Sequence, residues 1–447
     1  MRQNKESHIP ATHEGARAAT LTNEQMLVRS VLACLLWEDT FYEQGEDIAA
    51  RITRLVLSVK PEFAYEVAIA ARTKMKLRHV PLLIARALAS ISPKGNWAEK
   101  TIAEVIQRPD ELAEYLAIYW KNKDSGGKTI IGKTPLSAQS KRGLAKAFTK
   151  FSEYQLAKYN RDNMPIKLRD VLFLCHAKPL NIEQAQLWLR LIDKDLVIPD
   201  TWEVAISACK SEEEKKSEFS RLLTEGKMGA LAVLRNLRNF IKNHVPEGLV
   251  KTAIAELKTD RVLPYRFISA ARHAPHLEGD LEASMFKCLE GYDRLDGKTV
   301  LLVDVSGSME GRVSEKSDIT AMDAASGLAI MAREIAEDVK VYTFSSQVVP
   351  VPNRRGFALR DAIVHSQAHG GTQLGAALSW INKHVHYDRL IVITDEQSAD
   401  PVGKPLTAKS YMINVASNQN GVGYGDWTRV TGWSEAILDY ITELEKA

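Results

Sequence analysis

Five oxygen-bearing side chains in the last third of the chain have the types and spacing of a site for a hard divalent cation. Asp304, Ser306 and Ser308 form an Asp-x-Ser-x-Ser motif directly after an apolar run. Thr372 follows a Gly-Gly pair, and Asp395 follows a second apolar run. Oxygen donors without Cys or His suit Mg²⁺, Mn²⁺ or Ca²⁺ rather than zinc. Two carboxylates do not saturate such a cation, so water or the carboxylate of a protein partner would complete the coordination.

The motif on its own has a second interpretation, because Asp and Ser also cap helices and form turns. Thr372 and Asp395 favour the metal interpretation, since each is placed where a strand gives way to a helix or loop.

The residues from about 296 onward have the alternating pattern of an α/β domain. We expect strands at 299–305, 339–344, 389–394 and 410–415, and helices at 319–337, 373–385 and 435–445. This order predicts a doubly wound, Rossmann-like parallel sheet, in which residues that follow the strands meet at one edge. With its five oxygen donors, the segment 296–447 resembles a von Willebrand factor A (vWA) domain with a metal-ion-dependent adhesion site. The resemblance implies Mg²⁺ as the resident ion.

Length and composition predict a multidomain cytoplasmic protein. A chain of 447 residues exceeds one ordinary core, and none of its apolar runs approaches the ~20 residues of a membrane span. The four cysteines are far apart and form no Cys-x-x-Cys pair, which indicates reduced thiols. The N-terminus lacks the apolar core of a secretory signal.

The formal net charge of +3 hides an asymmetry between the two parts of the chain. From Lys298 onward there are 14 Lys and Arg against 18 Asp and Glu, which leaves 45 against 38 before it. The larger N-terminal part is therefore basic, as expected of a protein with a polyanionic partner.

The region before the α/β domain has helical periodicity and no strand-like alternation. We expect a polar arm over 1–21 and an all-α helical-repeat domain of helix pairs over 22–295. Predicted helices include 46–59, 61–75, 80–91, 111–120 and 183–191.

The segment Gly127–Thr134 matches the spacing of a phosphate-binding P-loop. A working P-loop needs a buried strand before it and a helix after it. Here the preceding residues 121–125 are charged, and Pro135 biases Thr134 away from helical geometry. The segment is therefore predicted to be a basic Gly-rich loop and not an ATP site.

The stretch from Lys141 to Pro179 combines cations with Tyr and His side chains. Such residues neutralise phosphates and stack on bases, although a solvated basic face has the same composition. His176 has a further interpretation as a half-buried residue at a helix end. The candidate RNA-binding residues are Lys141, Arg142, Lys158, Arg161, His176 and Lys178.

Several short motifs in order give this region a resemblance to the TROVE module of the Ro autoantigen family and its bacterial and phage relatives. They are 140–144, 158–161, 169–172, 176–179, 201–203, 229–231, 234–237 and 264–267. The resemblance implies a monomeric ring of HEAT-like repeats. Such a ring holds a structured small non-coding RNA (Y RNA) outside and single-stranded 3′ ends of misfolded RNA in its hole. By the match of motifs, Lys158, Arg161 and His176 correspond to contacts with the outer RNA.

With this resemblance we expect an RNA-binding protein of RNA maturation or quality control, whose metal site serves a protein partner. That the partner is a ribonuclease is implied by the family resemblance alone. We expect no enzymatic activity, because only Asp395-Glu396 comes near to a paired-carboxylate site. The alternatives are a metal-dependent protein-interaction scaffold with an incidental basic domain, and an ATPase or metal hydrolase.

Overall fold

The computed structural model describes residues 10–18, 20–32, 36, 43–91, 95–123, 129–132, 134–160, 164–259, 262–290, 292–313, 319–416, 418, 420–423, 425–432, 434 and 436–446. The chain forms two compact units. One comprises residues 1–48 and 209–447, and the other comprises residues 49–208. The domain bounds expected from sequence, 1–21, 22–295 and 296–447, stay a prediction.

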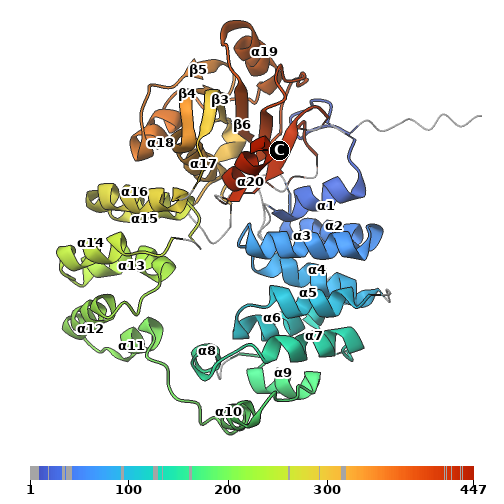
Figure 1. Cartoon of the computed structure of the whole chain (residues 1–447), viewed down its shortest axis with the longest axis vertical. Coiled ribbons are helices and arrows are strands. Elements are labelled where there is room, and N and C mark those ends of the chain that lie inside the picture. Colours follow the sequence, from blue (N-terminus) through green and yellow to red (C-terminus); the bar gives the residue numbers. More distant parts are fainter. Residues whose placement is uncertain are drawn as a thin grey trace, which may run out of the picture. The chain divides into compact units, whose positions relative to one another are not determined.

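The unit of residues 49–208 consists mainly of short helices, and those from α3 to α10 pack on other helices one to three places away in the sequence order (Figure 1). Proline opens α3 and α6 at the first helical position, where its missing N–H costs nothing. The helices are α2 (Gly45–Ser58), which begins in the other unit, α3 (Pro61–Thr73), α4 (His79–Ser90), α5 (Trp97–Val105), α6 (Pro109–Tyr119), α7 (Ala138–Phe148), α8 (Glu153–Tyr159), α9 (Leu168–Cys175), α10 (Ile182–Asp193) and α11 (Trp202–Ala208). The predicted helical texture is confirmed.

A short antiparallel hairpin interrupts the helices and corrects the expectation that this region has no strands. Strand β1 (Lys121–Lys123) pairs with β2 (Thr129–Ile131), whose β-branched residues favour extended backbone. The hairpin runs through the P-loop-like segment, and the next helix begins only at Ala138. The described part of this segment therefore lacks the strand–loop–helix order that a P-loop needs. Lys133 lies outside the described residues.

The other unit contains a second group of stacked helices. They are α12 (Glu212–Thr224), α13 (Ala230–Lys242), α14 (Glu247–Ala255), α15 (Tyr265–His273), η1 (Pro275–Leu277), α16 (Glu278–Phe286) and η2 (Lys287–Leu289). Helix α1 (Asn23–Leu32) is not part of this group and contacts β8. Helices α15 and α16 pack on α17 (Ala321–Ile335) and α18 (Gly356–Val364) of the α/β domain. Arg272 pairs there with Asp323, and Arg360 pairs with Glu278 at 2.9 Å.

The α/β domain is built on a six-stranded sheet in the order β5-β4-β3-β6-β7-β8 (Figure 1). Its strands are β3 (Leu295–Asp304), β4 (Ala336–Phe344), β5 (Val348–Pro350), β6 (Arg389–Thr394), β7 (Ser410–Asn414) and β8 (Thr428–Thr431). Five strands are parallel, as predicted, whereas β5 is an antiparallel edge strand. The strands β5 and β8 and the helix α18 were not expected from the sequence, because each is short.

Helices cover both faces of this sheet. Alternate residues of β3 point to opposite faces, so Val300 and Leu302 pack with α19 (Leu374–His384) in one buried cluster. Helix α17 contacts β3, β4 and β6. Because β3 and β6 are buried over nearly their whole length, both strands could be predicted from apolar runs in the sequence.

The C-terminal helix α20 (Ala436–Lys446) is fixed to the sheet by one carboxylate. Glu445 accepts hydrogen bonds from Arg389 Nε at 2.5 Å and from Tyr411 at 2.9 Å, and it pairs with Lys409 at 2.9 Å. Burial alone would raise the pKa of Glu445, but the bonds from Arg389 and Lys409 outweigh it and hold that pKa at about 2.

Glu445→Gln should destabilise the α/β domain by on the order of 2–3 kcal/mol at pH 7, because the folded state then loses its preference for the charged carboxylate. A depressed pKa gives stability above the unfolded value and loses it as the pH falls. The difference from the parent should therefore shrink between about pH 4.5 and pH 2. Thermal unfolding across pH measures it. Asp426→Asn, which breaks an exposed pair with Lys404, should cost about 0.5 kcal/mol or less. A pH-independent difference for Glu445→Gln would contradict the assignment.

Candidate metal centre and nucleic-acid surface

The two carboxylates of the predicted metal site lie at the carboxyl ends of neighbouring parallel strands. Asp304 is the last residue of β3, and Asp395 directly follows β6. The two strands are in register up to the pair Val303 and Ile393. Both carboxylates therefore reach the same edge of the sheet, where ligand sites of such folds are found.

The loop after β3 brings its two serines beside Asp304. The Ser306 N–H donates to Asp304 Oδ1 at 2.9 Å, and the hydroxyls of Ser306 and Ser308 are 3.2 Å apart. Ser308 lies in the short helix η3 (Gly307–Glu310). Thr394 donates to Asp304 Oδ2 at 2.6 Å and thereby orients the carboxylate.

Two backbone bonds hold the loop that carries Thr372 between the other ligand segments. The Gly307 N–H donates to Gly370 O at 3.1 Å, and the Ala399 N–H donates to Thr372 O at 2.7 Å. All five predicted metal residues are thus at the carboxyl end of a strand or in the segments that meet at this edge of the sheet, and each is at most 7 % exposed.

The electrostatics of this edge fit a divalent cation. Burial and, to a smaller extent, the neighbouring Asp395 carboxylate together raise the pKa of Asp304 to about 7. Burial also raises the pKa of Asp395, against the opposing effects of the Gln397 N–H and the Ser308 hydroxyl. Two buried carboxylates beside two hydroxyls form a hard-oxygen set that a divalent cation would neutralise. Over the described residues no group of three or more His, Cys, Asp or Glu could hold a metal ion, and the five predicted ligands likewise include only two carboxylates.

Glu396, next to Asp395, is engaged elsewhere. Its fully buried carboxylate pairs with Arg29 of α1 at 2.5 Å and with Arg429 of β8 at 2.7 Å. Burial would raise the pKa of Glu396, but the two arginines outweigh it and lower that pKa. The Asp395-Glu396 pair is therefore not two carboxylates sharing a proton. Arg29 and Arg429 were not anticipated, because nothing in the local sequence links them to residue 396.

The described candidate RNA-binding residues lie on neighbouring helices of the 49–208 unit. Lys141 and Arg142 belong to α7, Lys158 to α8, and His176 and Lys178 to the end of α9 and the loop after it. Helix α7 packs on α9, and α10 packs on both α8 and α9. Arg161 lies outside the described residues.

These side chains differ in their ion pairs and in their exposure to solvent. Arg142 Nε donates to the buried carboxylate of Glu99 at 2.5 Å, so part of its charge is used to join α7 to α5. His176 ends α9 in the left-handed conformation, with φ of 53°, and its side chain is exposed. The alternative of a half-buried histidine is therefore wrong. Lys178 is exposed as well.

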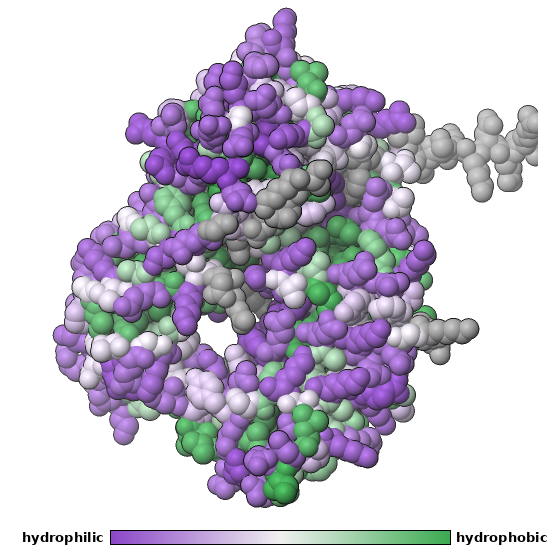
Figure 2. All heavy atoms as spheres, viewed as in Figure 1, coloured by the Kyte–Doolittle hydropathy of each residue, from purple (hydrophilic) through white to green (hydrophobic). Residues whose placement is uncertain are grey.

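A small cavity lies beside α8. It has a volume of about 240 Å³ and is lined by residues that include Arg78, Arg108, Tyr159 and Lys167. The Arg108 guanidinium is 4.7 Å from the centre of the Tyr159 ring. Exposed apolar side chains, among them Phe173, Leu180 and Ile182, gather over α9 and α10, and Figure 2 shows apolar surface there.

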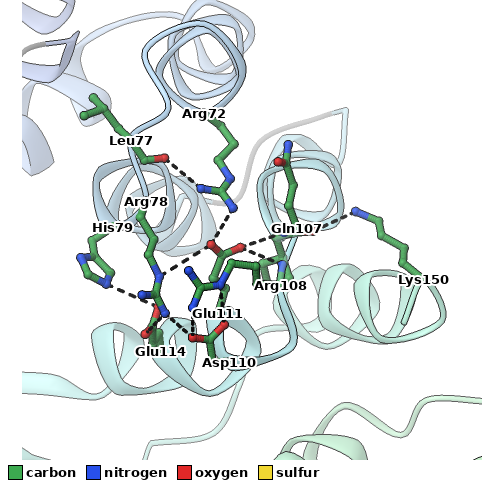
Figure 3. A network of polar contacts seen from close by, with 11 residues as sticks. Arg72, Leu77, Arg78, His79, Gln107, Arg108, Asp110, Glu111, Glu114 and Lys150 are labelled. Atoms are coloured by element: carbon green, nitrogen blue, oxygen red, sulfur yellow. Dashed lines mark hydrogen bonds and ion pairs between the residues drawn. The ribbon is translucent and has the colours of Figure 1, made fainter. Parts of the chain in front are cut away.

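A buried polar network joins α3, α4 and α6 close to this cavity (Figure 3). Glu111 is fully buried and accepts from Arg72 Nη2 at 2.6 Å and from the N–H groups of Gln107 and Arg108. Burial raises the pKa of Glu111, and Arg72 offsets this only in part. Asp110 joins Arg78 at 2.5 Å to Arg108 at 2.7 Å. Sequence reasoning missed this network, since its members are ordinary charged residues on three amphipathic helices.

The comparisons with known proteins agree with this architecture. Residues 10–194 match the family model of the TROVE domain, and residues 298–412 match that of the Ro60 vWA domain. The crystal structure of the Ro (RSR) protein of Deinococcus radiodurans has the same fold, with a TM-score of 0.59 and 17 % identity over 94 % of this chain and 99 % of that chain. No curated protein is significantly similar in sequence. In the described residues, no helix is long and apolar enough to cross a bilayer. The chain is therefore a TROVE-module protein that resembles the Ro family and carries a C-terminal Ro60-type vWA domain.

Proposed function

We propose that this chain is an RNA-binding protein of non-coding RNA maturation or quality control. The observation that carries the proposal is the placement of Lys158 on α8 and of His176 and Lys178 at the end of α9, within the segment that matches the TROVE model; both helices pack on α6 and α10. In this proposal these side chains contact the backbone of a structured small RNA, of the kind that Y RNAs represent. Single-stranded 3′ ends of misfolded RNA bind elsewhere, in the hole of the ring that the family resemblance implies.

The contacts differ in chemistry along this surface. Lys158 and Lys178 neutralise phosphates, whereas the exposed His176 ring stacks on a base or donates to a backbone oxygen. Arg142 contributes less, because Glu99 already compensates its charge. Tyr159 and Arg108, which border the cavity beside Lys158, add a stacking surface for one unpaired base.

We also propose that Asp304, Ser306, Ser308, Thr372 and Asp395 hold Mg²⁺, which would supply an open coordination position for a carboxylate of a protein partner such as a ribonuclease. The support is the meeting of five hard oxygen donors at one sheet edge. In this proposal the chain acts by binding and is cytoplasmic, and it is not itself an enzyme. The engagement of Glu396 with two arginines favours this over a metal hydrolase.

The variant Lys158→Ala/His176→Asn/Lys178→Ala should weaken binding of a synthetic stem–loop RNA by about tenfold or more. Asparagine is chosen for position 176 because it tolerates the left-handed conformation. Two lost phosphate contacts should also flatten the log–log salt slope by about 2. Filter binding over a salt series measures both quantities.

The matched control is Lys60→Ala/Lys74→Ala, which removes two exposed lysines from the same unit. It should leave the affinity and the slope close to those of the parent. An oligouridine tail should bind the triple variant nearly as well as the parent. If the control loses as much as the triple variant, binding reflects overall charge and there is no defined surface.

Asp304→Asn should abolish Mg²⁺ or Mn²⁺ binding, because it removes one of two charged ligands while keeping the shape of the side chain. Asp361→Ala, at an exposed position of α18, should bind either ion like the parent. Calorimetry on the full chain measures the affinity, and RNA binding should persist in both variants. Equal metal affinity of Asp304→Asn and parent would refute the site.

A further inference from the structure

The N-terminal segment of residues 10–18 docks on the loop that carries the metal ligand Asp395. Thr12 Oγ1 donates to Ser398 O at 2.7 Å, and the His13 N–H donates to Gln397 Oε1 at 3.0 Å. Thr12 is only 6 % exposed, and Gln397 and Ser398 are fully buried. The described part of the expected polar arm, residues 10–18, is therefore hydrogen-bonded to the α/β domain.

The segment has a defined fold of its own. Ala11 and Arg17 form an antiparallel bridge, and the Thr12 N–H donates to Ala16 O at 2.9 Å. Gly15 turns the chain with φ of 95°, a conformation that glycine adopts without a steric cost. Ala16 is buried at 4 % exposure. A hairpin of this kind presents Thr12 and His13 to the loop in one fixed geometry.

Helix α1 extends the same attachment through Arg29. Its guanidinium pairs with Glu396 Oε2 at 2.5 Å and donates to the carbonyl oxygens of Asn418 and Asn420, both at 2.5 Å. Glu396 itself has φ of 60°, which is unfavourable for a non-glycine residue and persists only where the surroundings enforce it. A Cβ on residue 421 would lie 2.2 Å from Glu396 Oε2, so the Arg29–Glu396 ion pair can lie against the backbone there only because residue 421 is glycine.

Gln397 connects the docked segment to the metal ligand directly. Its N–H donates to Asp395 Oδ1 at 3.0 Å, and its side-chain amide donates to Asn420 O at 2.7 Å. The same side chain accepts from the His13 N–H, and Asn420 in turn donates to Ala11 O at 2.8 Å. A single residue thus lies between the segment and the carboxylate that would bind the cation.

We infer that the segment 10–18 and helix α1 are positioning elements of the metal site, so that docking of the segment and binding of a divalent cation reinforce each other. The docked segment holds the loop of Asp395 in its ligating geometry, and a bound cation fixes the surface on which the segment docks. Such coupling is reciprocal, since a cation that tightens docking by some factor is itself bound more tightly by that factor. The inference rests on the proposed metal site.

The first experiment uses the parent chain alone. Amide hydrogen exchange of residues 10–18 is measured with and without saturating Mn²⁺, whose binding is established in parallel by calorimetry. Mn²⁺ should slow exchange at His13 and Ala18, which both donate in the docked segment, by at least about fivefold. Asp304→Asn should show no Mn²⁺ effect at these amides.

The second experiment tests the reverse direction. Thr12→Val keeps the shape of the side chain and removes the hydroxyl bonded to Ser398, so it should weaken Mn²⁺ binding by about threefold or more. Thr20→Val makes the same change at an exposed position and should bind Mn²⁺ like the parent. If Mn²⁺ binds the parent but alters neither exchange nor the Thr12→Val affinity, the coupling is wrong and the metal site stands. If the parent binds no Mn²⁺, the metal site and the coupling both fall.

Discussion

Two carboxylates buried side by side are the constraint around which the α/β domain is arranged. Asp304 and Asp395 are forced together by the parallel pairing of β3 and β6, and neither strand can shift without moving a charge. Burial and mutual repulsion raise the pKa of Asp304 to about 7, so the arrangement costs free energy unless something compensates it. The hydroxyls of Ser306, Ser308 and Thr394 compensate in part. A divalent cation is the remaining compensation that the donor set fits.

The same physical rule recurs where no metal is involved, with arginine as the counter-charge. Glu396, Glu111 and Glu99 are buried acids, and each receives guanidinium groups from other elements. A buried charge that lost its partner would be strongly destabilising, by roughly 3–5 kcal/mol. Each of these carboxylates therefore specifies which helices or loops must pack around it. In the helical unit this role belongs to Glu111, which binds together α3, α4 and α6.

Features formed by residues that are close in the sequence could be predicted from it, whereas contacts between residues far apart in the chain could not. The Asp-x-Ser-x-Ser loop could be read because strand, turn and ligands are consecutive, and the helix boundaries near Pro61 and Pro109 could be read from their capping positions. The P-loop-like segment stays predicted not to bind ATP, and its hairpin was missed because three-residue strands leave no periodic pattern. Arg29 could not be found, since its partner Glu396 is 367 residues away and only the folded topology joins them.

Basic side chains therefore have two roles in this protein: some join helices by pairing with an acid, and others are proposed to bind phosphate. A buried acidic partner identifies the first kind. Arg142 was grouped with Lys158 and Lys178 on composition, yet its bond to Glu99 makes it part of the joint between α5 and α7. If Arg142 turned toward a phosphate, the buried Glu99 would lose one of its two cationic partners and keep only Lys146, which pairs with it at 2.6 Å. An exposed lysine at a helix end loses only water and side-chain freedom when it binds. Lys178, exposed in the loop after α9, therefore has the smallest cost of engagement, whereas Lys158 is half-buried beside the Tyr159 ring; the sequence alone could not have ranked them.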